Sequence, residues 1–303
     1  MSTQPTILQE RITSGKAILL AEIQPPRGGD PAPLRAAAKR FAGKVHALGV
    51  NDNRDRVAMS ALAAASLVLA EGLEPILHVT TRDRNRIALV SEALGAQALG
   101  IRNLLCTSGT HQTLGSYRSA KNVYDIDAVQ LLQAYANLSS DGGLLGESAM
   151  EGAGPFCLGA VASPDADPPA LQLSRLVKKV AAGARFLVTQ PVYDTVRFEA
   201  WWKEVTRRGV HEQAAILAGI QPLSDGPFAQ AGPRSSAGIP DPLLDRAASQ
   251  GDPVARRAAA IRIAVETIRR LSDLPGIRGF CISADGDPEA ALQIIEESGL
   301  VSD

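Results

Sequence analysis

Short apolar runs suited to buried strands recur along the chain, with alanine-rich helical stretches between them. Several of the spacings between consecutive strand-like runs are about thirty residues, the length that one strand, one helix and two turns require. The strand-like runs begin near Ala17, Val45, Pro75, Asn103, Phe156, Arg185, Ala214 and Ile277. The helical stretches are Pro31 to Phe41, Val57 to Glu71, Arg84 to Leu99, Asp125 to Leu138, Pro168 to Ala182, Thr195 to Arg207, Asp252 to Leu271 and Pro288 to Ser298. This alternation predicts a parallel sheet.

The number of strand–helix pairs distinguishes two parallel-sheet architectures. Eight pairs within about 250 to 300 residues fit a (β/α)8 barrel, also called a TIM barrel. An open doubly wound sheet is the main alternative, but no G-x-G-x-x-G loop follows any predicted strand. We therefore predict an α/β protein in which residues 1–303 form a single (β/α)8 barrel domain. Two segments exceed the period, Ser108 to Pro155 and Gln221 to Asp252, and long loops are often functional.

Composition and charge narrow the class of protein. The chain has 303 residues, of which 45% are hydrophobic, and its net charge is −1. It can bury a substantial core, and no basic field indicates binding to nucleic acid or to an anionic membrane. No apolar run reaches the roughly 18 residues of a membrane span, and the N-terminal residues lack a signal-peptide core. We therefore expect a soluble cytoplasmic protein.

The three cysteines, Cys106, Cys157 and Cys281, are far apart in the sequence, and each lies within an apolar run. Such spacing fits neither a disulfide framework nor a zinc site. We expect all three to be small buried hydrophobic residues, and we predict that the protein has no metal site.

The stretch Ala17 to Arg27, with the sequence A-I-L-L-A-E-I-Q-P-P-R, is central to the prediction of function. Its apolar run suits a strand buried on both faces, and Pro25 and Pro26 end the strand because proline has no N–H to donate. Glu22 therefore lies at the strand's end. Its carboxylate faces either solvent or a polar site, because burial against apolar groups would cost several kcal/mol.

Polar residues close almost every predicted strand, at the end where (β/α)8 barrels build their active sites. Any one of them could be a helix cap or a turn former, and Asp165 and Asp285 are especially open to that interpretation. The set as a whole is harder to explain in this way. In chain order it contains Glu22, Asn51, Asp52, His78, Thr80, Thr81, Thr107, Ser108, Ser163, Asp165, Thr189, Gln190, Gln221, Ser283 and Asp285.

Individual members of this set suggest a ligand site without metal chemistry. A histidine in an apolar run, such as His78, is typical of a hydrogen-bonded structural residue. Gln190 offers an amide that can donate and accept at the edge of a heterocyclic ligand. Lys178 and Lys179 close a helical stretch, where a solvated last turn is the simpler interpretation. The acid Glu22, a histidine, amides and hydroxyls, without a metal set or a nucleophile–base pair, indicate an organic cofactor.

Motifs at these positions resemble the methylenetetrahydrofolate reductase family, and most closely its short bacterial form without a regulatory domain. Through residues 17–198 the motifs are, in order, A-E-I-Q-P-P-R-G, L-H-V-T-T-R-D-R-N-R, G-I-R-N-L-L-C-T-S-G, Y-D-I-D-A-V-Q-L-L, L-G-A-V-A-S-P and K-K-V-A-A-G-A-R-F-L-V-T-Q-P-V-Y-D. The tail, I-L-A-G-I followed by I-I-E-E-S-G-L, agrees more loosely. The motifs are specific as a set rather than singly.

The resemblance implies a flavin-binding barrel that reduces 5,10-methylenetetrahydrofolate to 5-methyltetrahydrofolate through FAD, with NAD(P)H or another donor reducing the flavin. Glu22 matches the family's general acid, which assists opening of the five-membered ring so that hydride can reach the iminium carbon. Gln190 matches the substrate-contacting glutamine, and Phe228 the aromatic residue that stacks on folate or nicotinamide. The positions that hold FAD in the family are matched by, or lie beside, Asn51, His78, Ser108, Ser163, Asp167 and Lys179.

One departure from the family pattern bears on function. The family usually has G-D after the fourth strand, near flavin and pterin, whereas this chain has Ser108, Gly109 and Thr110. Thr110, a predicted substrate contact, can hydrogen-bond but carries no charge. The alternatives are therefore a reductase that passes hydride directly from NADH, and a folate-binding or partner-binding subunit without turnover. Glu22 and Gln190 argue against the latter, and a homo-oligomer or a redox partner subunit is compatible with the sequence.

Overall fold

Eight parallel strands close into a barrel in the computed structural model, in chain order and with β8 paired to β1. The structure describes residues 4–141, 149–223, 239–248, 252–284 and 286–300. The predicted (β/α)8 barrel is confirmed, and every predicted strand is present within a few residues of its expected start. The strands are β1 (Ile18–Ile23), β2 (Ala47–Val50), β3 (Pro75–Thr80), β4 (Asn103–Thr107), β5 (Cys157–Ala162), β6 (Phe186–Pro191), β7 (Ala215–Ile220) and β8 (Gly279–Ser283).

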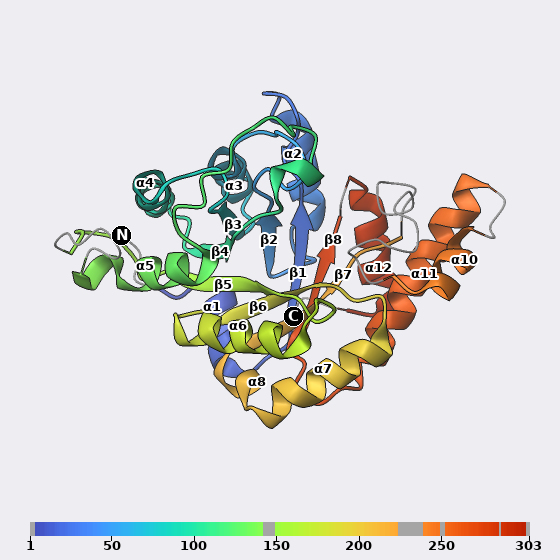
Figure 1. Cartoon of the computed structure of the whole chain (residues 1–303). Helices are drawn as coiled ribbons and strands as arrows, with labels where there is room; N and C mark the ends of the chain where they lie inside the picture. Colours follow the sequence, from blue (N-terminus) through green and yellow to red (C-terminus); the bar gives the residue numbers. More distant parts are fainter. Residues whose placement is uncertain (1–3, 142–148, 224–238, 249–251, 285, 301–303) are drawn as a thin grey trace.

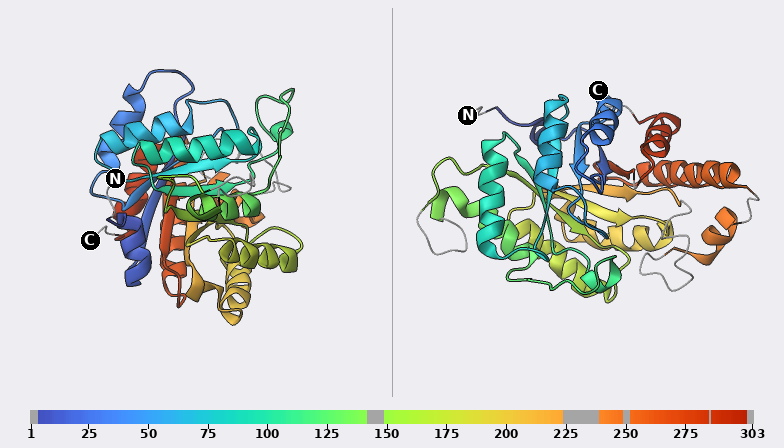
Figure 2. Two further views of the ribbon diagram at one scale, coloured as in Figure 1. Left: turned by 90° about the vertical axis from the view of Figure 1, so that its left-hand side faces the viewer. Right: turned by 90° about the horizontal axis from the view of Figure 1, so that it is seen from above.

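Helices surround the strands, as Figure 1 and the view from above in Figure 2 show. Each predicted helical stretch contains a helix: α2 (Ala32–Phe41), α3 (Ala61–Ala70), α4 (Arg86–Ala98), α5 (Ala128–Asp141), α6 (Pro169–Ala181), α7 (Thr195–Arg207), α11 (Pro253–Ser272) and α12 (Pro288–Ser298). The described residues also contain helices that were not predicted, α1 (Ile7–Ser14), α8 (Val210–Gln213) and α10 (Asp241–Ala248). The sequence did carry a signal for α1, because Thr6 and Gln9 form a capping box at its start.

Alternate strand residues point into the barrel and form a closed apolar layer. Phe186 fills the space above Gly159, because a Cβ at Gly159 would lie 2.2 Å from the Phe186 ring. Residues of the opposite parity pack outward against the helices in a larger core. The inner layer consists of Leu8, Ile18, Leu20, Ala47, Ile76, Leu105, Cys157, Phe186, Val188, Ala215, Leu217 and Cys281.

Helix α1 closes the N-terminal end of the barrel. Leu8 packs into the inner layer, and Glu74 accepts hydrogen bonds from the backbone N–H groups of Ile7 at 2.6 Å and Leu8 at 3.0 Å. A carboxylate at a helix N-terminus is favoured by the helix dipole. The opposite end of the barrel, where the strands have their C-terminal ends, remains open and can form a site. In Figure 1 the arrowhead of β1 marks this end.

The long segment after β4 carries the short 3-10 helix η1 (Gln112–Leu114) and is tied to neighbouring loops by backbone hydrogen bonds. The N–H of Ser116 donates to the carbonyl of Asp55 at 2.8 Å, and the N–H of Val123 donates to the carbonyl of Arg82 at 2.7 Å. The second long segment, after β7, lies mostly outside the described residues. Asp285, which follows β8 in the sequence, is also outside them.

All three cysteines are free and buried, as predicted, and burial raises the pKa of the Cys157 thiol to about 12. These thiols therefore act as packing residues near neutral pH. In the described parts of the chain, no helix is long and apolar enough to cross a membrane, and no group of His, Cys, Asp and Glu could hold a metal ion.

Candidate active site

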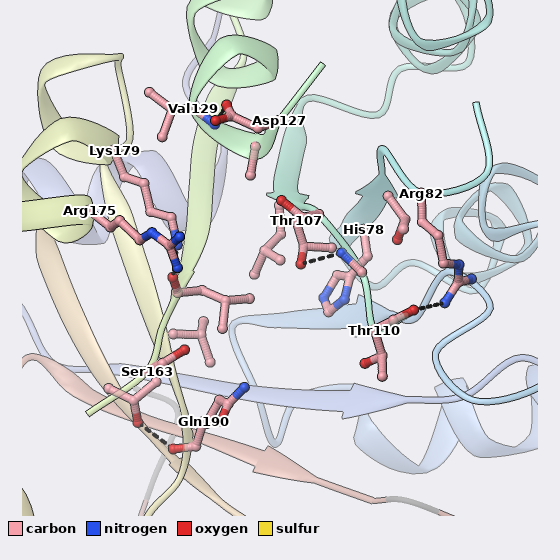
Figure 3. Close-up of a pocket in the computed structure, with 18 of the residues that line it drawn as sticks. His78, Arg82, Thr107, Thr110, Asp127, Val129, Ser163, Arg175, Lys179 and Gln190 are labelled. Atoms are coloured by element: carbon pink, nitrogen blue, oxygen red, sulfur yellow. Dashed lines mark hydrogen bonds between the residues drawn. The ribbon is translucent and has the colours of Figure 1, made fainter. Parts of the chain in front are cut away.

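Polar side chains at the open end of the barrel lie on the same strand faces as the apolar inner layer. Leu20 and Val188 belong to that layer, and Glu22 and Gln190, two positions further on, share their face. They line a pocket of about 1010 Å³, shown in Figure 3, which draws polar side chains from several strand ends. A pocket of this volume is large enough for a cofactor and a substrate group.

Glu22 is fixed on one wall of the pocket, with 16% of its side chain exposed. Asn51 Nδ2 donates a hydrogen bond to Glu22 Oε1 at 3.0 Å, and Arg54 Nη1 lies 3.8 Å from the same oxygen. The other oxygen, Oε2, is 3.8 Å from Nε2 of His78, which is too long for a hydrogen bond. One carboxyl oxygen is thus held by an amide, while the described residues place no hydrogen bond on the other.

His78 lies buried beside Glu22. Its pKa is lowered from the ordinary value, chiefly because burial disfavours the charged ring, and the opposing effects of Glu22 and Asp52 are smaller. His78 is therefore neutral near pH 7 and can donate a hydrogen bond without adding a charge. Gly49 leaves room for the ring, since a Cβ at that position would lie 3.0 Å from His78 Nε2.

Strand β6 is irregular where it presents Gln190 to the pocket. The pairing of β6 with β7 shifts register between Val188 and Pro191. Thr189 Oγ1 spans the break, accepting from the N–H of Gly219 at 2.9 Å and donating to the carbonyl of Gln190 at 2.8 Å. The backbone is thereby satisfied, and the exposed Gln190 amide can donate to and accept from a ligand.

The wall on the left of Figure 3 is basic. Arg175, Lys178 and Lys179 come from α6, and Lys179 Nζ donates to the carbonyl of Val161 at 2.6 Å. Burial lowers the pKa of Lys179, repulsion from Arg175 adds to this, and Asp127 opposes it. Arg175 and Lys178 form no ion pair with any described residue, so this wall presents positive charge to a ligand.

The loop after β4 supplies the side of the pocket nearest His78. Ser108 and Thr110 line it, and Gly109 between them has a φ of +79°. A Cβ at Gly109 would lie 2.3 Å from Thr80 Cγ2, so only glycine allows this close approach. The carbonyl of Thr110 accepts a hydrogen bond from Arg82 Nη1 at 2.8 Å, and Thr110 itself lines the pocket.

Most of the predicted site residues meet in this one pocket. Asp167 is not among the lining residues, since its side chain is 77% exposed and accepts a hydrogen bond from Arg197 Nη2 at 3.0 Å. Phe228 lies outside the described residues. The residues that do line the pocket are Glu22, Asn51, His78, Ser108, Thr110, Ser163, Lys179 and Gln190.

Several lining residues were not found from the sequence, notably Arg54, Arg175 and Asp127. A signal existed for Arg175, which precedes Lys179 by four positions and so shares its face of α6. A signal also existed for Asp127, because it precedes α5 and forms a capping box with Gln130: Asp127 Oδ1 accepts from the N–H of Gln130, and the N–H of Asp127 donates to Gln130 Oε1. Arg54 lies in a loop, whose path follows no hydrophobic period, and the sequence carried no comparable signal for it.

The lining is chemically suited to flavin adenine dinucleotide. The positive side chains of Arg175 and Lys178 can neutralise the negative charge of the cofactor's diphosphate. An apolar surface for the flat flavin ring is offered by Leu105, Val161 and Val188. Amide and hydroxyl groups at the strand ends can hydrogen-bond to ring nitrogen and oxygen atoms. The donor set therefore fits this cofactor.

Comparison with protein families extends the motif resemblance to nearly the whole barrel. Residues 7–299 match the family model described as methylenetetrahydrofolate reductase. The chain belongs to the methylenetetrahydrofolate reductase family. The resemblance expected from motifs in residues 17–198 is therefore confirmed, and the match includes the C-terminal strands.

Two curated members of the methylenetetrahydrofolate reductase family are similar to this chain. A probable methylenetetrahydrofolate reductase (NADPH) from Caenorhabditis elegans is 24% identical over 256 residues, covering 82% of this chain and 36% of the relative. Methylenetetrahydrofolate reductase 1 from Schizosaccharomyces pombe is 28% identical over 156 residues, covering 49% of this chain and 25% of the relative. The matches thus span well under half the length of either relative.

Solved structures with the same fold include an uncharacterized protein from Clostridium thermocellum that binds two copies of 5-methyl-5,6,7,8-tetrahydrofolic acid. It superposes with a TM-score of 0.67 at 12% identity, covering 97% of this chain and 100% of that chain. The long-chain alkane monooxygenase LadA superposes with a TM-score of 0.50 at 11% identity, covering 95% and 92%. At these identities the likeness shows a shared fold.

Proposed function

We propose that this barrel reduces 5,10-methylenetetrahydrofolate to 5-methyltetrahydrofolate, with Glu22 as the general acid and residues 1–303 as one catalytic domain. The observation that carries the proposal is that Glu22, oriented by Asn51, and Gln190 line the same pocket. Opening of the five-membered ring requires an acid, and a bifunctional amide can hydrogen-bond to the edge of the pterin. Family membership supports the choice of substrate.

In this proposal Glu22 supplies the proton that opens the five-membered ring. The proton passes to the ring nitrogen that leaves, the C–N bond breaks with its electron pair going to that nitrogen, and the carbon becomes an iminium. A hydride added to this carbon then gives the methyl group. Because Asn51 holds Oε1, we assign the proton to Oε2 of Glu22.

The substrate would be positioned by side chains that can hydrogen-bond or stack. The Gln190 amide lies exposed in the pocket and can pair with the edge of the pterin. Thr110 offers a hydroxyl on the opposite side, and Phe228 is proposed as the stacking residue. These contacts orient the ring so that the proton from Glu22 and the hydride reach adjacent atoms.

We propose FAD as the resident cofactor, with NAD(P)H as the electron donor. When bound, FAD would supply the hydride in this pocket. The support for it is the basic wall on α6 facing the apolar and hydroxyl-bearing strand ends. The residues proposed to hold it are Asn51, His78, Ser108, Ser163 and Lys179, whereas Asp167, which pairs with Arg197 outside the pocket, is left out of this set.

A second candidate function is hydride transfer directly from NADH to the same substrate, without a flavin. The observation that favours it is Thr110, an uncharged residue on the pocket wall where the family usually has aspartate. A folate-binding subunit without turnover is less favoured, because it would not need the oriented Glu22 carboxyl.

Purified protein distinguishes these functions. Flavin bound at this site makes the protein yellow, with absorption at about 450 nm. Turnover of methylenetetrahydrofolate should then depend on the bound flavin. Colourless protein that turns over with NADH and gains nothing from added FAD supports the second function. Protein that binds 5-methyltetrahydrofolate but reduces no methylenetetrahydrofolate with either nicotinamide, with or without FAD, would overturn both.

A further inference from the structure

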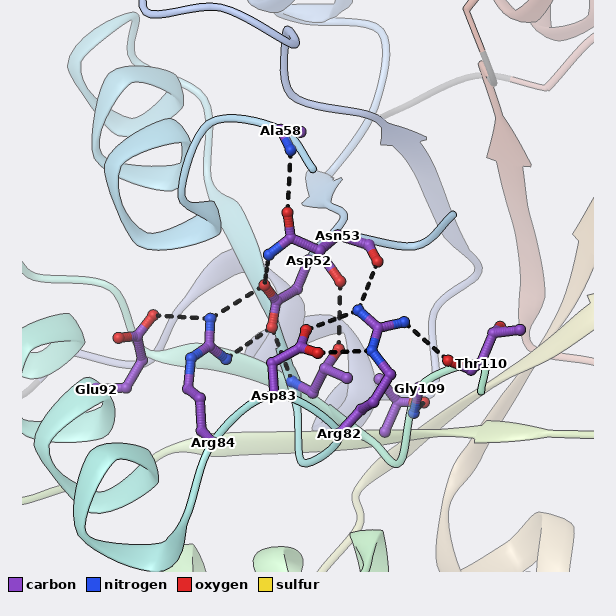
Figure 4. A network of polar contacts seen from close by, with 11 residues as sticks. Asp52, Asn53, Ala58, Arg82, Asp83, Arg84, Glu92, Gly109 and Thr110 are labelled. Carbon is purple, nitrogen blue, oxygen red and sulfur yellow. Dashed lines mark hydrogen bonds and ion pairs between the residues drawn. The ribbon is translucent and has the colours of Figure 1, made fainter. Parts of the chain in front are cut away.

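Arg82, from the motif T-T-R-D after β3, joins three loops at the open end of the barrel. Its Nη1 donates to the carbonyl of Thr110 at 2.8 Å, and its Nη2 donates to the carbonyl of Asn53 at 2.8 Å. Figure 4 shows both bonds radiating from one guanidinium group. The side chain thereby links the loops after β2 and β4 to its own loop, which follows β3.

The guanidinium is buried and held in place by its sequence neighbour. Arg82 is 7% exposed, and Asp83 accepts from its Nε and its Nη2, each at 2.7 Å. The hydrogen bond to Asp83 raises the pKa of Arg82, so the group stays charged. These contacts use four of the five N–H groups of an arginine, which leaves at most one for a ligand.

Left-handed backbone lies at or beside the two carbonyls that Arg82 binds. Asn53 has a φ of +46°, and Gly109, next to Thr110, has a φ of +79°. A Cβ at Gly109 would lie 3.3 Å from the Cβ of Arg82, so the loop after β4 rests directly on this side chain. A non-glycine residue such as Asn53 keeps a left-handed backbone only where its surroundings hold it, and the hydrogen bond from Arg82 to its carbonyl is part of those surroundings.

We propose that Arg82 is a positioning residue that fixes the Gly109–Thr110 wall of the pocket through the carbonyl of Thr110. Its catalytic consequence rests on the proposed function, since Thr110 lines the pocket in which the folate would bind. Without the guanidinium fork, the carbonyls of Asn53 and Thr110 lose their shared donor, and the wall that faces the ligand shifts.

The matched control is Arg86, four residues further along. Arg86 also pairs with an aspartate, Asp125, and also joins the segment after β3 to the segment after β4. It does not line the pocket and is bonded to no residue of the Gly109–Thr110 wall. Arg82→Ala and Arg86→Ala therefore make the same chemical change, and only the first removes the donor to Thr110.

The first measurement is hydrogen exchange of peptides that contain Gly109 and Thr110, read by mass spectrometry. Exchange should become at least about tenfold faster in Arg82→Ala, since the restraint on the local opening is lost, and stay unchanged in Arg86→Ala. Arg82→Lys should resemble Arg82→Ala, because an ammonium has no planar fork to span two carbonyls. Guanidinium ion at millimolar concentration should slow exchange again in Arg82→Ala, whereas ammonium should not.

The second measurement is the dissociation constant of 5-methyltetrahydrofolate, together with kcat/KM where turnover is present. Both should worsen in Arg82→Ala, kcat/KM by about 10²-fold, as displaced positioning groups commonly do. Unchanged exchange in Arg82→Ala, or full recovery of the wild-type values in Arg82→Lys, would overturn the proposal. So would faster exchange with unchanged ligand binding. If wild-type protein binds no folate, the proposed function fails, while the exchange data still decide whether Arg82 fixes the wall.

Discussion

Asn51 donates a hydrogen bond of 3.0 Å from Nδ2 to Oε1 of Glu22, across the gap between the ends of β2 and β1. Asn51 is itself fixed, because its N–H donates to the carbonyl of Ile23 at 3.1 Å. A carboxyl group held on one oxygen by a fixed amide presents its second oxygen in one direction. This geometry is what a directional proton transfer requires.

Replacing Glu22 with Gln should separate proton transfer from the rest of the reaction. The amide matches the carboxyl in size, so the fold and reduction of the flavin by NAD(P)H should change little. Oxidation of the reduced flavin by methylenetetrahydrofolate should slow by at least about 10²-fold, or about 2.7 kcal/mol of barrier, because no acid remains. Stopped-flow absorbance times the two half-reactions separately.

Glu92→Gln is the control for this change. Glu92 has an exposure close to that of Glu22, 18% against 16%, and does not line the pocket. Both half-reactions should keep wild-type rates in this variant. Equal slowing of both half-reactions in Glu22→Gln would assign Glu22 a structural role, and slowing of neither would remove it from the mechanism.

Gly49→Ala should displace the His78 ring, which lies beside Glu22. The added Cβ would lie 3.0 Å from His78 Nε2, so the ring must move within a packed wall. We expect a loss of about 1–3 kcal/mol in the free energy of unfolding, measured by urea denaturation, together with slower turnover. Gly29→Ala, where a Cβ would meet nothing within 4 Å, should be nearly neutral. Equal stability of the two variants would show that the ring accommodates the methyl group.

Thr110→Asp restores a charge on the pocket wall. If flavin binds there, its reduction potential should fall by on the order of tens of millivolts, because a nearby negative charge disfavours added electrons in a low-dielectric site. Spectroelectrochemical titration measures this shift. Thr113→Asp places the same charge on the same loop but outside the lining residues, and should have little effect. Identical potentials in both variants would mean that Thr110 does not face the flavin.

Asp165→Asn should change how stability depends on pH. Burial raises the pKa of Asp165 from 3.8 to about 6, although Arg197 opposes the shift. A carboxyl whose pKa is raised on folding favours the folded state at low pH, and this contribution is lost as pH rises through about 6. At pH 7.5 the variant should therefore be more stable than wild type by up to about 3 kcal/mol.

Urea denaturation at pH 5 and pH 7.5 measures this difference. The advantage of Asp165→Asn should be smaller at pH 5, where wild-type Asp165 is largely protonated. Asp167→Asn, two residues away with its side chain 77% exposed, is the matched surface variant measured beside it. An Asp165→Asn advantage that is the same at both pH values would contradict the assigned titration.

The fold could be predicted from the sequence because its signal is local. Continuous apolar runs for the strands, with helical stretches between them, predict the barrel. Because successive side chains of a strand point to opposite faces, Glu22 and Gln190 share the inner face with Leu20 and Val188. Glu22 lies near the end of β1, and each position along a strand determines which face its side chain occupies. Helix α1 was missed although its capping box was present, because it is short and only weakly amphipathic.

The sequence by itself thus determined the alternation of strands and helices, the barrel architecture and the polar residues at the strand ends. Only the tertiary structure decided how the loops meet. Arg82 bonds to Asn53 and Thr110, which lie 29 and 28 positions away, and Asp167 turns to Arg197 rather than to the pocket. Loop paths depend on such long-range contacts between backbone carbonyls and buried charges, and no period along the chain encodes them.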